Sequence, residues 1–220
     1  YGMTTGLELR VLSQFESLKD QNTSQKISGI SDLEIGTKIQ LYKRENINTE
    51  IAFLSHIILP TGSKYLTNDK FGTINKLSIS HELNDTIALV GSVGWEDWSK
   101  LDSVNLSVTK GTAKLPKHWD DTWNYAGGIH YHLSDLWMLQ CGIAYDTSPT
   151  TREYRTADMP IDRQVRYAVG ATYKYSEKLT IGTAFEYADY GSANIDSDSL
   201  KGKYADNDIY FGAVNFNWKF

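Results

Sequence analysis

The chain has 220 residues and a formal net charge of −5, with 14 Tyr, 7 Phe and 6 Trp but only 4 Pro. This length suits one domain, and an acidic chain without a basic stripe is not expected to bind nucleic acid. No run of about 18 apolar residues occurs, which excludes a transmembrane helix. The mean hydropathy of −0.41 is that of a soluble protein, but a transmembrane barrel has a similar value because only alternate residues face lipid.

Ten segments alternate apolar and polar residues, which is the period-two pattern of a strand with one apolar face. In chain order they are 7–16, 33–41, 49–59, 76–80, 85–109, 123–133, 137–146, 165–175, 179–187 and 210–220. We interpret 85–109 as one long strand, bent near 95–98. A separate strand at 104–108 would make eleven and would break the regular alternation of the connections.

The final segment carries the sharpest signal. Val214, Phe216, Trp218 and Phe220 share one face, and the chain ends on that phenylalanine. An aromatic end on an apolar face suits a membrane interface, and it is typical of the last strand of a bacterial outer-membrane barrel. Such a strand would be read by the barrel-assembly machinery. The alternative is an edge strand of a soluble β-sandwich.

The connections fall into two length classes that alternate along the chain. Short turns are expected near 45–48, 82–85, 134–135 and 176–178, and long loops near 18–31, 60–72, 109–120, 147–163 and 190–207. Up-and-down outer-membrane barrels have short periplasmic turns and long extracellular loops. The pattern therefore puts both chain ends on the periplasmic side.

The polar faces carry charges at many positions, among them Glu34, Lys38, Lys76 and Arg166. Such faces suit a wet, enclosed lumen better than a dry core, whereas a lipocalin-like barrel would be apolar inside. The aromatic residues at strand ends form a girdle pattern: Trp123, Tyr131, Trp137, Tyr145, Tyr167, Tyr175, Trp218 and Phe220. We therefore predict one all-β domain, 1–220: a monomeric, closed, transmembrane antiparallel up-and-down β-barrel of about ten strands. Its partners would be outer-membrane lipid and lipopolysaccharide.

From about residue 94 the chain resembles the long-chain fatty-acid outer-membrane transporter family. The matching segments are 94–99, 119–128, 142–149, 153–160 and 167–173. Members of that family import hydrophobic molecules, including fatty acids and aromatic hydrocarbons. The resemblance implies passive uptake of a small hydrophobic ligand, for which a detergent could substitute. The family also has about fourteen strands and an N-terminal plug, for which this chain has no room.

Residues 1–90 resemble a second outer-membrane barrel family, associated with phenol meta-pathway degradation. Segments 32–38, 59–63 and 79–85 carry this resemblance. Our hypothesis is a chimera of two barrel fragments joined near 90–95. The alternative is one divergent member of the transporter family. A structural or engineered hybrid scaffold, with its lumen closed by salt bridges and no transport activity, is the alternative function.

The transporter resemblance places Lys117 where that family has a lysine that contacts the fatty-acid carboxylate. Leu115 and Trp119 flank it and would complete an apolar slot with a cationic end. The alternative is an ordinary solvated loop lysine. We expect no catalytic group, no cofactor and no metal, since His130 and His132 lack further ligands at suitable spacing.

A second set of charged residues flanks the predicted loop 147–163: Asp146, Arg152, Arg155, Asp162, Arg163 and Arg166. Charge-assisted pairs among them would fold this loop back onto the barrel rim. We favour this structural role over ligand binding. The guanidinium groups could alternatively bind lipopolysaccharide phosphates.

Overall fold

The computed structural model of the chain describes most of its length. The described ranges are 2–4, 6–13, 15–19, 26–44, 47–63, 70–97, 103–108, 111–116, 118–157, 161–197, 200–204 and 207–218. None of the helical segments within these ranges has the length and apolar character needed to span a membrane.

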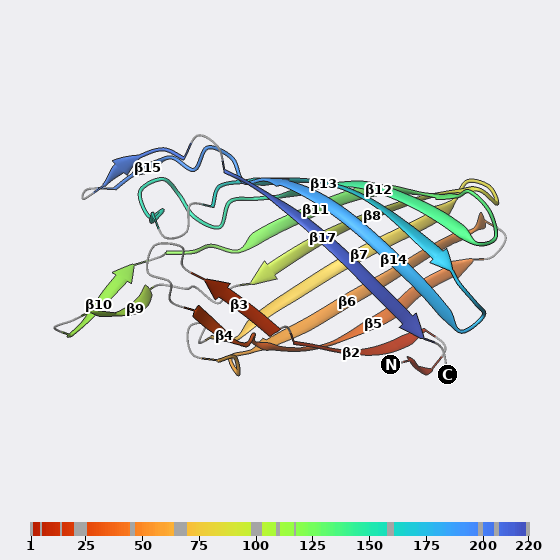
Figure 1. Cartoon of the computed structure of the whole chain (residues 1–220), viewed down its shortest axis with the longest axis horizontal. Coiled ribbons are helices and arrows are strands. Elements are labelled where there is room, and N and C mark those ends of the chain that lie inside the picture. Colours follow the sequence, from red (N-terminus) through yellow and green to blue (C-terminus); the bar gives the residue numbers. More distant parts are fainter. Residues whose placement is uncertain are drawn as a thin grey trace.

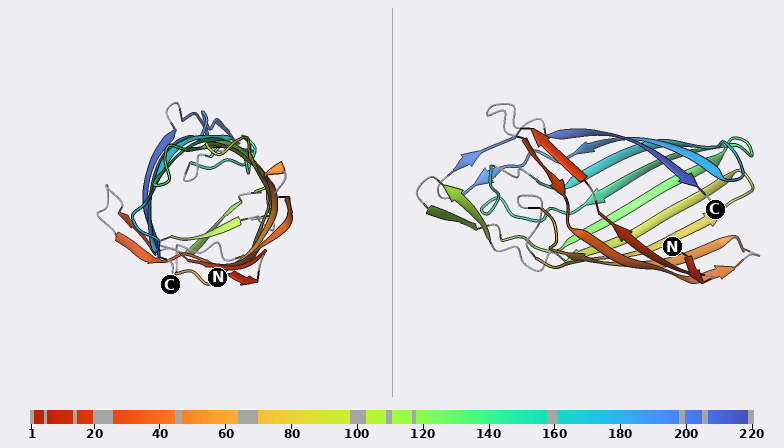
Figure 2. Two further views of the ribbon diagram at one scale, coloured as in Figure 1. Left: turned by 90° about the vertical axis from the view of Figure 1, so that its right-hand side faces the viewer. Right: turned by 60° about the horizontal axis from the view of Figure 1, so that its bottom comes forward.

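One antiparallel sheet of eleven strands curls into a barrel (Figures 1 and 2). In spatial order its strands are β1 (Gly2–Thr4), β2 (Leu7–Leu12), β5 (Leu33–Arg44), β6 (Thr49–Leu59), β7 (Gly72–Glu82), β8 (Ile87–Asp97), β11 (Thr122–His132), β12 (Trp137–Asp146), β13 (Gln164–Lys174), β14 (Leu179–Asp189) and β17 (Asp208–Trp218). Each strand pairs with the next barrel strand along the chain, which confirms the up-and-down topology. β1 is the only addition to the ten predicted strands in the described sheet.

Three small hairpins project from the end of the barrel that carries the long loops, here called the long-loop end (Figure 1). They pair β3 (Phe15–Lys19) with β4 (Lys26–Ile30), β9 (Ser103–Val108) with β10 (Gly111–Pro116), and β15 (Ile195–Asp196) with β16 (Lys201–Gly202). The prediction of one strand over 85–109 is therefore wrong. β8 stops at Asp97, and β9 pairs with β10 outside the barrel. The loop alternation survives, because both strands of this hairpin lie within one long loop.

The opposite end, here called the short-turn end, has tight turns with a shared hydrogen-bond scheme. The side-chain oxygens of Asn84, Ser134 and Ser176 each accept from the amides two and three residues further on. Asn and Ser favour turns because of this local bonding. The two chain termini lie near each other at this end (Figures 1 and 2).

The predicted complete ring of hydrogen bonds is not found among the described residues. There the ladder begins at β1 and ends at β17, with no pairing between these two edges. β1 folds back at Gly6, whose φ is 92°, and pairs with the edge of β2 that would have to meet β17. β17 is accordingly exposed along its whole length.

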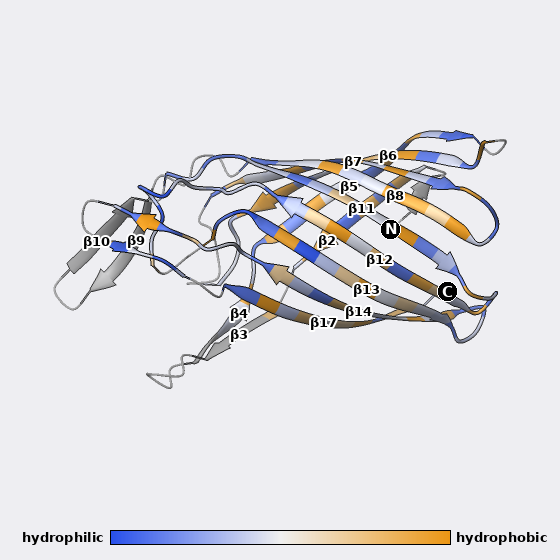
Figure 3. Ribbon diagram, turned by 90° about the horizontal axis from the view of Figure 1, so that it is seen from above, coloured by the Kyte–Doolittle hydropathy of each residue, from blue (hydrophilic) through white to orange (hydrophobic). Residues whose placement is uncertain are grey.

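Hydrophilic and hydrophobic residues alternate along the barrel strands, as the sequence predicts (Figure 3). Trp218 is 55% exposed, and Tyr173 packs on the outward Trp137 with ring centroids 4.6 Å apart. A second outward aromatic group lies toward the long-loop end, where Tyr187 contacts Tyr167 and Tyr210 at 6.4 and 5.2 Å. These two levels match the aromatic belts of a membrane barrel. Phe220 lies outside the described residues.

Candidate functional site

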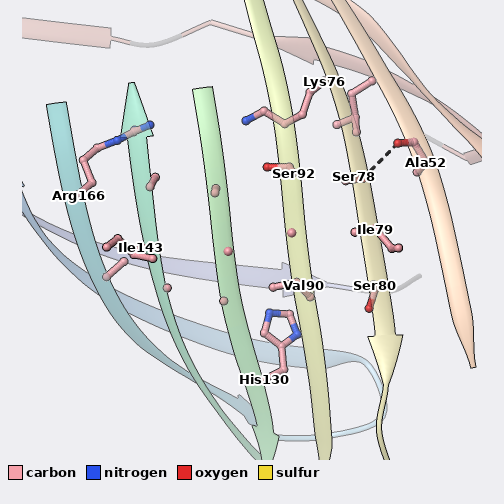
Figure 4. A pocket seen from close by; sticks show the side chains of 18 of the residues that line it. Ala52, Lys76, Ser78, Ile79, Ser80, Val90, Ser92, His130, Ile143 and Arg166 are labelled. Carbon is pink, nitrogen blue, oxygen red and sulfur yellow. Dashed lines mark hydrogen bonds between the residues drawn. The ribbon is translucent and has the colours of Figure 1, made fainter. Parts of the chain in front are cut away.

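A cavity of about 540 Å³ occupies the middle of the lumen (Figure 4). One side of it is lined by small residues from the C-terminal strands: Ala126 and Gly128 of β11, Gly142 and Ala144 of β12, and Ala168 of β13. We call this set the small-residue wall. Charged side chains of β2, β5, β6 and β7 line the other side, and Arg166 of β13 and Glu186 of β14 also line the cavity.

Strand register explains why the small-residue wall is smooth. Gly128 lies opposite Gly142, which lies opposite Ala168 on the next strand, and Ala126 lies opposite Ala144. A Cβ added to Gly128 would lie 2.7 Å from the carbonyl oxygen of Cys141, so the strands meet too closely there for a side chain. The short run Ala126–Gly128 was the sequence signal for this wall, and the predictions from sequence did not use it.

The charged groups nearest the long-loop end form a partly satisfied network. Arg166 Nη2 contacts Asp146 Oδ2 at 2.8 Å, and Asn124 Nδ2 donates to Asp146 Oδ1 at 2.7 Å. Arg166 Nε and Asn124 Oδ1 are buried and have no hydrogen-bond partner among the described residues. Buried polar atoms are nearly always hydrogen-bonded, so these two atoms are expected to bond to water or to a ligand.

Ion pairs in the lumen run along the wall and do not cross the interior. Arg166 and Asp146 lie on neighbouring strands, as do His56 and Glu34, which approach to 3.4 Å. Arg10 and Glu8, at 2.8 Å, lie on the same strand. In the part of the chain that the structure describes, no ion pair bridges opposite walls, so these contacts leave the cavity open.

A family model described as "Outer membrane protein transport protein (OMPP1/FadL/TodX)" matches residues 68–220. The chain belongs to this family. It is an all-β barrel of the bacterial cell outer membrane, and several of the proteins it resembles are named as transport proteins or channels.

Named relatives of this family share moderate identity with the chain. Outer membrane protein P1 of Haemophilus influenzae is 32% identical over 114 residues, which cover 51% of this chain and 25% of the relative. The long-chain fatty acid transport protein of Escherichia coli K12 is 24% identical over 169 residues, 74% of this chain and 38% of the relative. The chain therefore spans well under half the length of these two relatives.

The fold is shared with solved structures as well. An outer-membrane channel from Pseudomonas putida F1 superposes with a TM-score of 0.65 at 13% identity. The match covers 98% of this chain and 79% of that one. At this level of identity the likeness concerns the fold alone.

Two of the three residues predicted for ligand binding, Leu115 and Trp119, lie at the long-loop end. Lys117 is outside the described residues, and the side chain of Leu115, in β10, is not described either. Trp119 is half-buried. Next to it, His118 has a φ of 44° and packs on Tyr154 at 4.3 Å, and Asp120 N donates to Pro149 O. These contacts attach the segment after β10 to loop 147–163, and the role of Lys117 stays a prediction.

Arg155 is the centre of that loop, and its side chain is only 2% exposed. Its guanidinium donates to Ile161 O at 2.8 Å and to Asn194 O at 2.6 Å, and it contacts Ser148 Oγ and Asp162 Oδ1 at 3.3 and 3.1 Å. Together with the pairs Arg163–Asp189 and Arg166–Asp146, this confirms that charged pairs hold the loop onto the barrel rim.

The β15–β16 hairpin on the same rim is closed by an exposed pair, with Lys201 Nζ and Asp196 Oδ1 2.8 Å apart. The hydrogen bond from Lys201 and its positive charge lower the pKa of Asp196, and the same bond raises the pKa of Lys201. The pair's contribution to hairpin stability is therefore complete between the ordinary Asp and Lys ranges. It is lost as pH falls through the lowered value or rises through the raised one.

Lys201→Met is expected to raise the pKa of the Asp196 carboxyl back toward its ordinary value, because the two largest causes of the shift, the hydrogen bond from Lys201 and its charge, are removed. Carboxyl-detected NMR titration of the protein in detergent micelles measures this directly. Lys203→Met, which changes an exposed lysine of the same loop, is the control and should leave the Asp196 titration in place. If the titration midpoint of Asp196 in Lys201→Met equalled that of the wild type, the pairing of Lys201 with Asp196 would be contradicted.

A second cavity, of about 660 Å³, is lined mainly by outward-facing apolar side chains, including Ile51, Leu77, Val93 and Tyr125. Ala126 and Ala144 contribute to both cavities. The lumen and the outer hollow therefore lie back to back across one stretch of wall built from small residues.

Proposed function

We propose that this chain provides the barrel of a passive outer-membrane channel for small hydrophobic molecules, such as fatty acids or aromatic hydrocarbons. The observation that carries the proposal is a lumen cavity, not crossed by any described ion pair, in a member of an outer-membrane transport family. The Escherichia coli relative is itself named a long-chain fatty acid transport protein. These relatives support a transport role over a catalytic one.

The alternative is a structural or hybrid scaffold with a closed lumen. That hypothesis needs side chains that bridge the interior. The described ion pairs instead join neighbours along the wall, which favours the channel.

Lys117 is proposed to receive the ligand's acid group, with Leu115 and Trp119 beside its apolar part. Lys117→Ala should lower the uptake of a dilute fatty acid into liposomes by about tenfold, because a hydrogen bond between charged groups is worth about 1.5 kcal/mol. Uptake of a neutral aromatic hydrocarbon should be unchanged. Stopped-flow or fluorescent-dye uptake into liposomes that contain the purified barrel gives both rates.

Lys203→Ala is the matched control for charge removal at the long-loop end, and it should leave both rates intact. If no solute enters the liposomes although the barrel keeps its heat-modifiable migration on gels, the scaffold hypothesis replaces the channel.

The proposed partners follow from the surface. The outer apolar hollow fits an acyl chain of outer-membrane lipid, and arginines of the rim fit lipopolysaccharide phosphates. The C-terminal strand β17, with its outward Phe216 and Trp218, is proposed as the segment that the barrel-assembly machinery reads. We propose that the assembled barrel is a monomer, which light scattering in detergent would test.

The chain is also proposed to be a hybrid of two barrel families joined near 90–95, inside β8. The match to the transport family leaves residues 1–67 outside it, which supports a different origin for the N-terminal part, but it includes 68–90 and so does not support the position of the junction. Comparing each part separately with related sequences tests this proposal. One family that matches the chain end to end would rule it out.

A further inference from the structure

A loop segment lies over the long-loop mouth of the lumen. Residues 147–157 follow β12, and in the view along the barrel axis they lie inside the ring of strands (Figure 2, left). Figure 1 places the same segment at the long-loop end. A solute that enters the lumen from this end therefore has to pass beside segment 147–157.

On one side the segment is attached to the chain just before β11. Asp120 N donates to Pro149 O at 2.8 Å, and the rings of Tyr154 and His118 lie 4.3 Å apart. His118 has a φ of 44°, a left-handed backbone that residues other than glycine seldom adopt. Such strain persists only where surrounding contacts hold it, and the ring of Tyr154 is one of these contacts.

On its other side the segment is attached to the loop between β14 and β17. Arg155 Nη1 donates to Asn194 O at 2.6 Å, and Tyr204 Oη donates to Ala157 O at 2.8 Å. Segment 147–157 therefore spans the rim from the start of β11 to the loop before β17.

Buried residues gather where the segment meets that loop. Thr150, Ala193 and Ile195 are all buried, and so is the guanidinium of Arg155. Segments that open easily have few buried contacts. Burial to this degree indicates a fixed element, which does not move aside when a solute arrives.

The lumen cavity itself is too large to select narrow molecules. Its volume of about 540 Å³ falls among the pockets of about 300–1,000 Å³ that hold drug-sized ligands. Such a cavity admits bodies larger than one acyl chain or one aromatic ring. Because the width of the narrowest passage decides what a channel admits, selection by width falls to the segment over the mouth.

We propose that segment 147–157 is a fixed constriction of the long-loop entrance, and that it sets the width of the molecules that the lumen admits. Tyr154, which is 47% exposed beside His118, is the width-determining residue. Arg155 is the positioning residue that holds the segment across the mouth. Slender acyl chains and single aromatic rings pass, and fused polycyclic compounds are excluded. The inference deepens the proposed function and rests on it for the nature of these molecules.

Polymer exclusion in planar bilayers measures the width of each entrance separately. The purified barrel is inserted from one chamber, and single-channel conductance is recorded with polyethylene glycols of increasing size on one side at a time. In the wild type, the exclusion limit at the long-loop side should lie below that at the short-turn side. Tyr154→Ala should raise the long-loop limit and increase the conductance about twofold, because conduction follows pore width.

Arg155→Gln should raise the same limit at least as far, because it releases the whole segment. Arg152→Gln, at an exposed arginine of the same segment, is the matched control and should retain the wild-type limit. Tyr154→Phe keeps the ring and should restore that limit. Heat-modifiable migration verifies that each variant is folded. The constriction is refuted if Tyr154→Ala or Arg155→Gln keeps the wild-type limit and conductance, which includes a barrel that conducts in none of these forms.

Hydrocarbon uptake into liposomes, above the rate of protein-free liposomes, distinguishes this inference from the proposed function. If the wild type takes up toluene, and pyrene enters only through Tyr154→Ala, both proposals stand. Polymer limits that shift as expected in a barrel that takes up no hydrocarbon would refute the channel for hydrophobic molecules and leave the constriction intact. Equal uptake of toluene and pyrene by the wild type would refute the constriction alone.

Discussion

Replacing Arg155 with glutamine is expected to detach loop 147–163 from the segment around Asn194. The guanidinium satisfies two carbonyl oxygens and the carboxylate of Asp162, all at one buried point. Glutamine reaches at most part of this set, and each buried carbonyl oxygen left without a donor costs about 1–3 kcal/mol. Hydrogen–deuterium exchange of 148–157 and 192–196 should accelerate by at least a hundredfold.

Arg152→Gln is the matched control, because Arg152 is exposed in the same loop and the substitution keeps the hydrogen bond that its carbonyl oxygen accepts from Asp196 N. Exchange in the barrel strands should be unaltered in both variants, since the network lies outside the wall. Protection of the loop that persists in Arg155→Gln would show that packing, and not this arginine, holds it.

Replacing Gly128 with valine is expected to destabilise the barrel itself. The new Cβ would stand 2.7 Å from the Cys141 carbonyl oxygen, which belongs to the paired strand and has no freedom to move aside. Overpacking of this kind costs about 1–3 kcal/mol or more, because the strands must separate locally. Urea unfolding in lipid vesicles should show a lower midpoint, and the heat-modifiable band should disappear at a lower temperature.

Gly212→Val provides the comparison. Gly212 lies on β17, and a Cβ there meets nothing within 4 Å. The urea midpoint of Gly212→Val should equal or exceed that of the wild type, since valine favours strands and this position faces outward. Equal losses in the two variants would mean that glycine is needed for chain flexibility and not for close strand approach.

The outward face was predictable residue by residue. Trp218 and Tyr173 face outward as expected, because strand alternation is a local property and a shift by one residue would put every charge in lipid. Turn positions were predictable for the same reason, since Asn84, Ser134 and Ser176 form bonds within their own turns.

The long loops and the two unpaired edges of the sheet, at β1 and β17, were less predictable from the sequence. The segment Val104–Val108 has a strand pattern that fits a barrel wall and an outer hairpin equally well, so alternation could not place it. The role of β1 was hidden for a similar reason, because three residues are too few to show a period.

The candidate sites were likewise predictable only where their residues lie close together in the sequence. The charged residues around loop 147–163 could be grouped from sequence because they crowd a short stretch, but the choice of Arg155 as the centre depends on Asn194, 39 residues away. Lys76 and Arg166 are 90 residues apart in a chain where only neighbouring strands are predictably adjacent. Register places Lys76 in one row with Gly94, Asn124 and Asp146, and Arg166 Nη2 lies 2.8 Å from Asp146 Oδ2, so only the assembled sheet brings these residues together.

The amino-acid sequence by itself determined which residues meet lipid, which line the interior, and where the chain turns, because each of these depends on contacts only a few residues apart. The tertiary structure alone decided which inward residues converge, how much space remains between them, and that β1 occupies the edge facing β17. These depend on the curvature and register of the whole sheet, which sum small twists over eleven strands and leave no local trace in the chain.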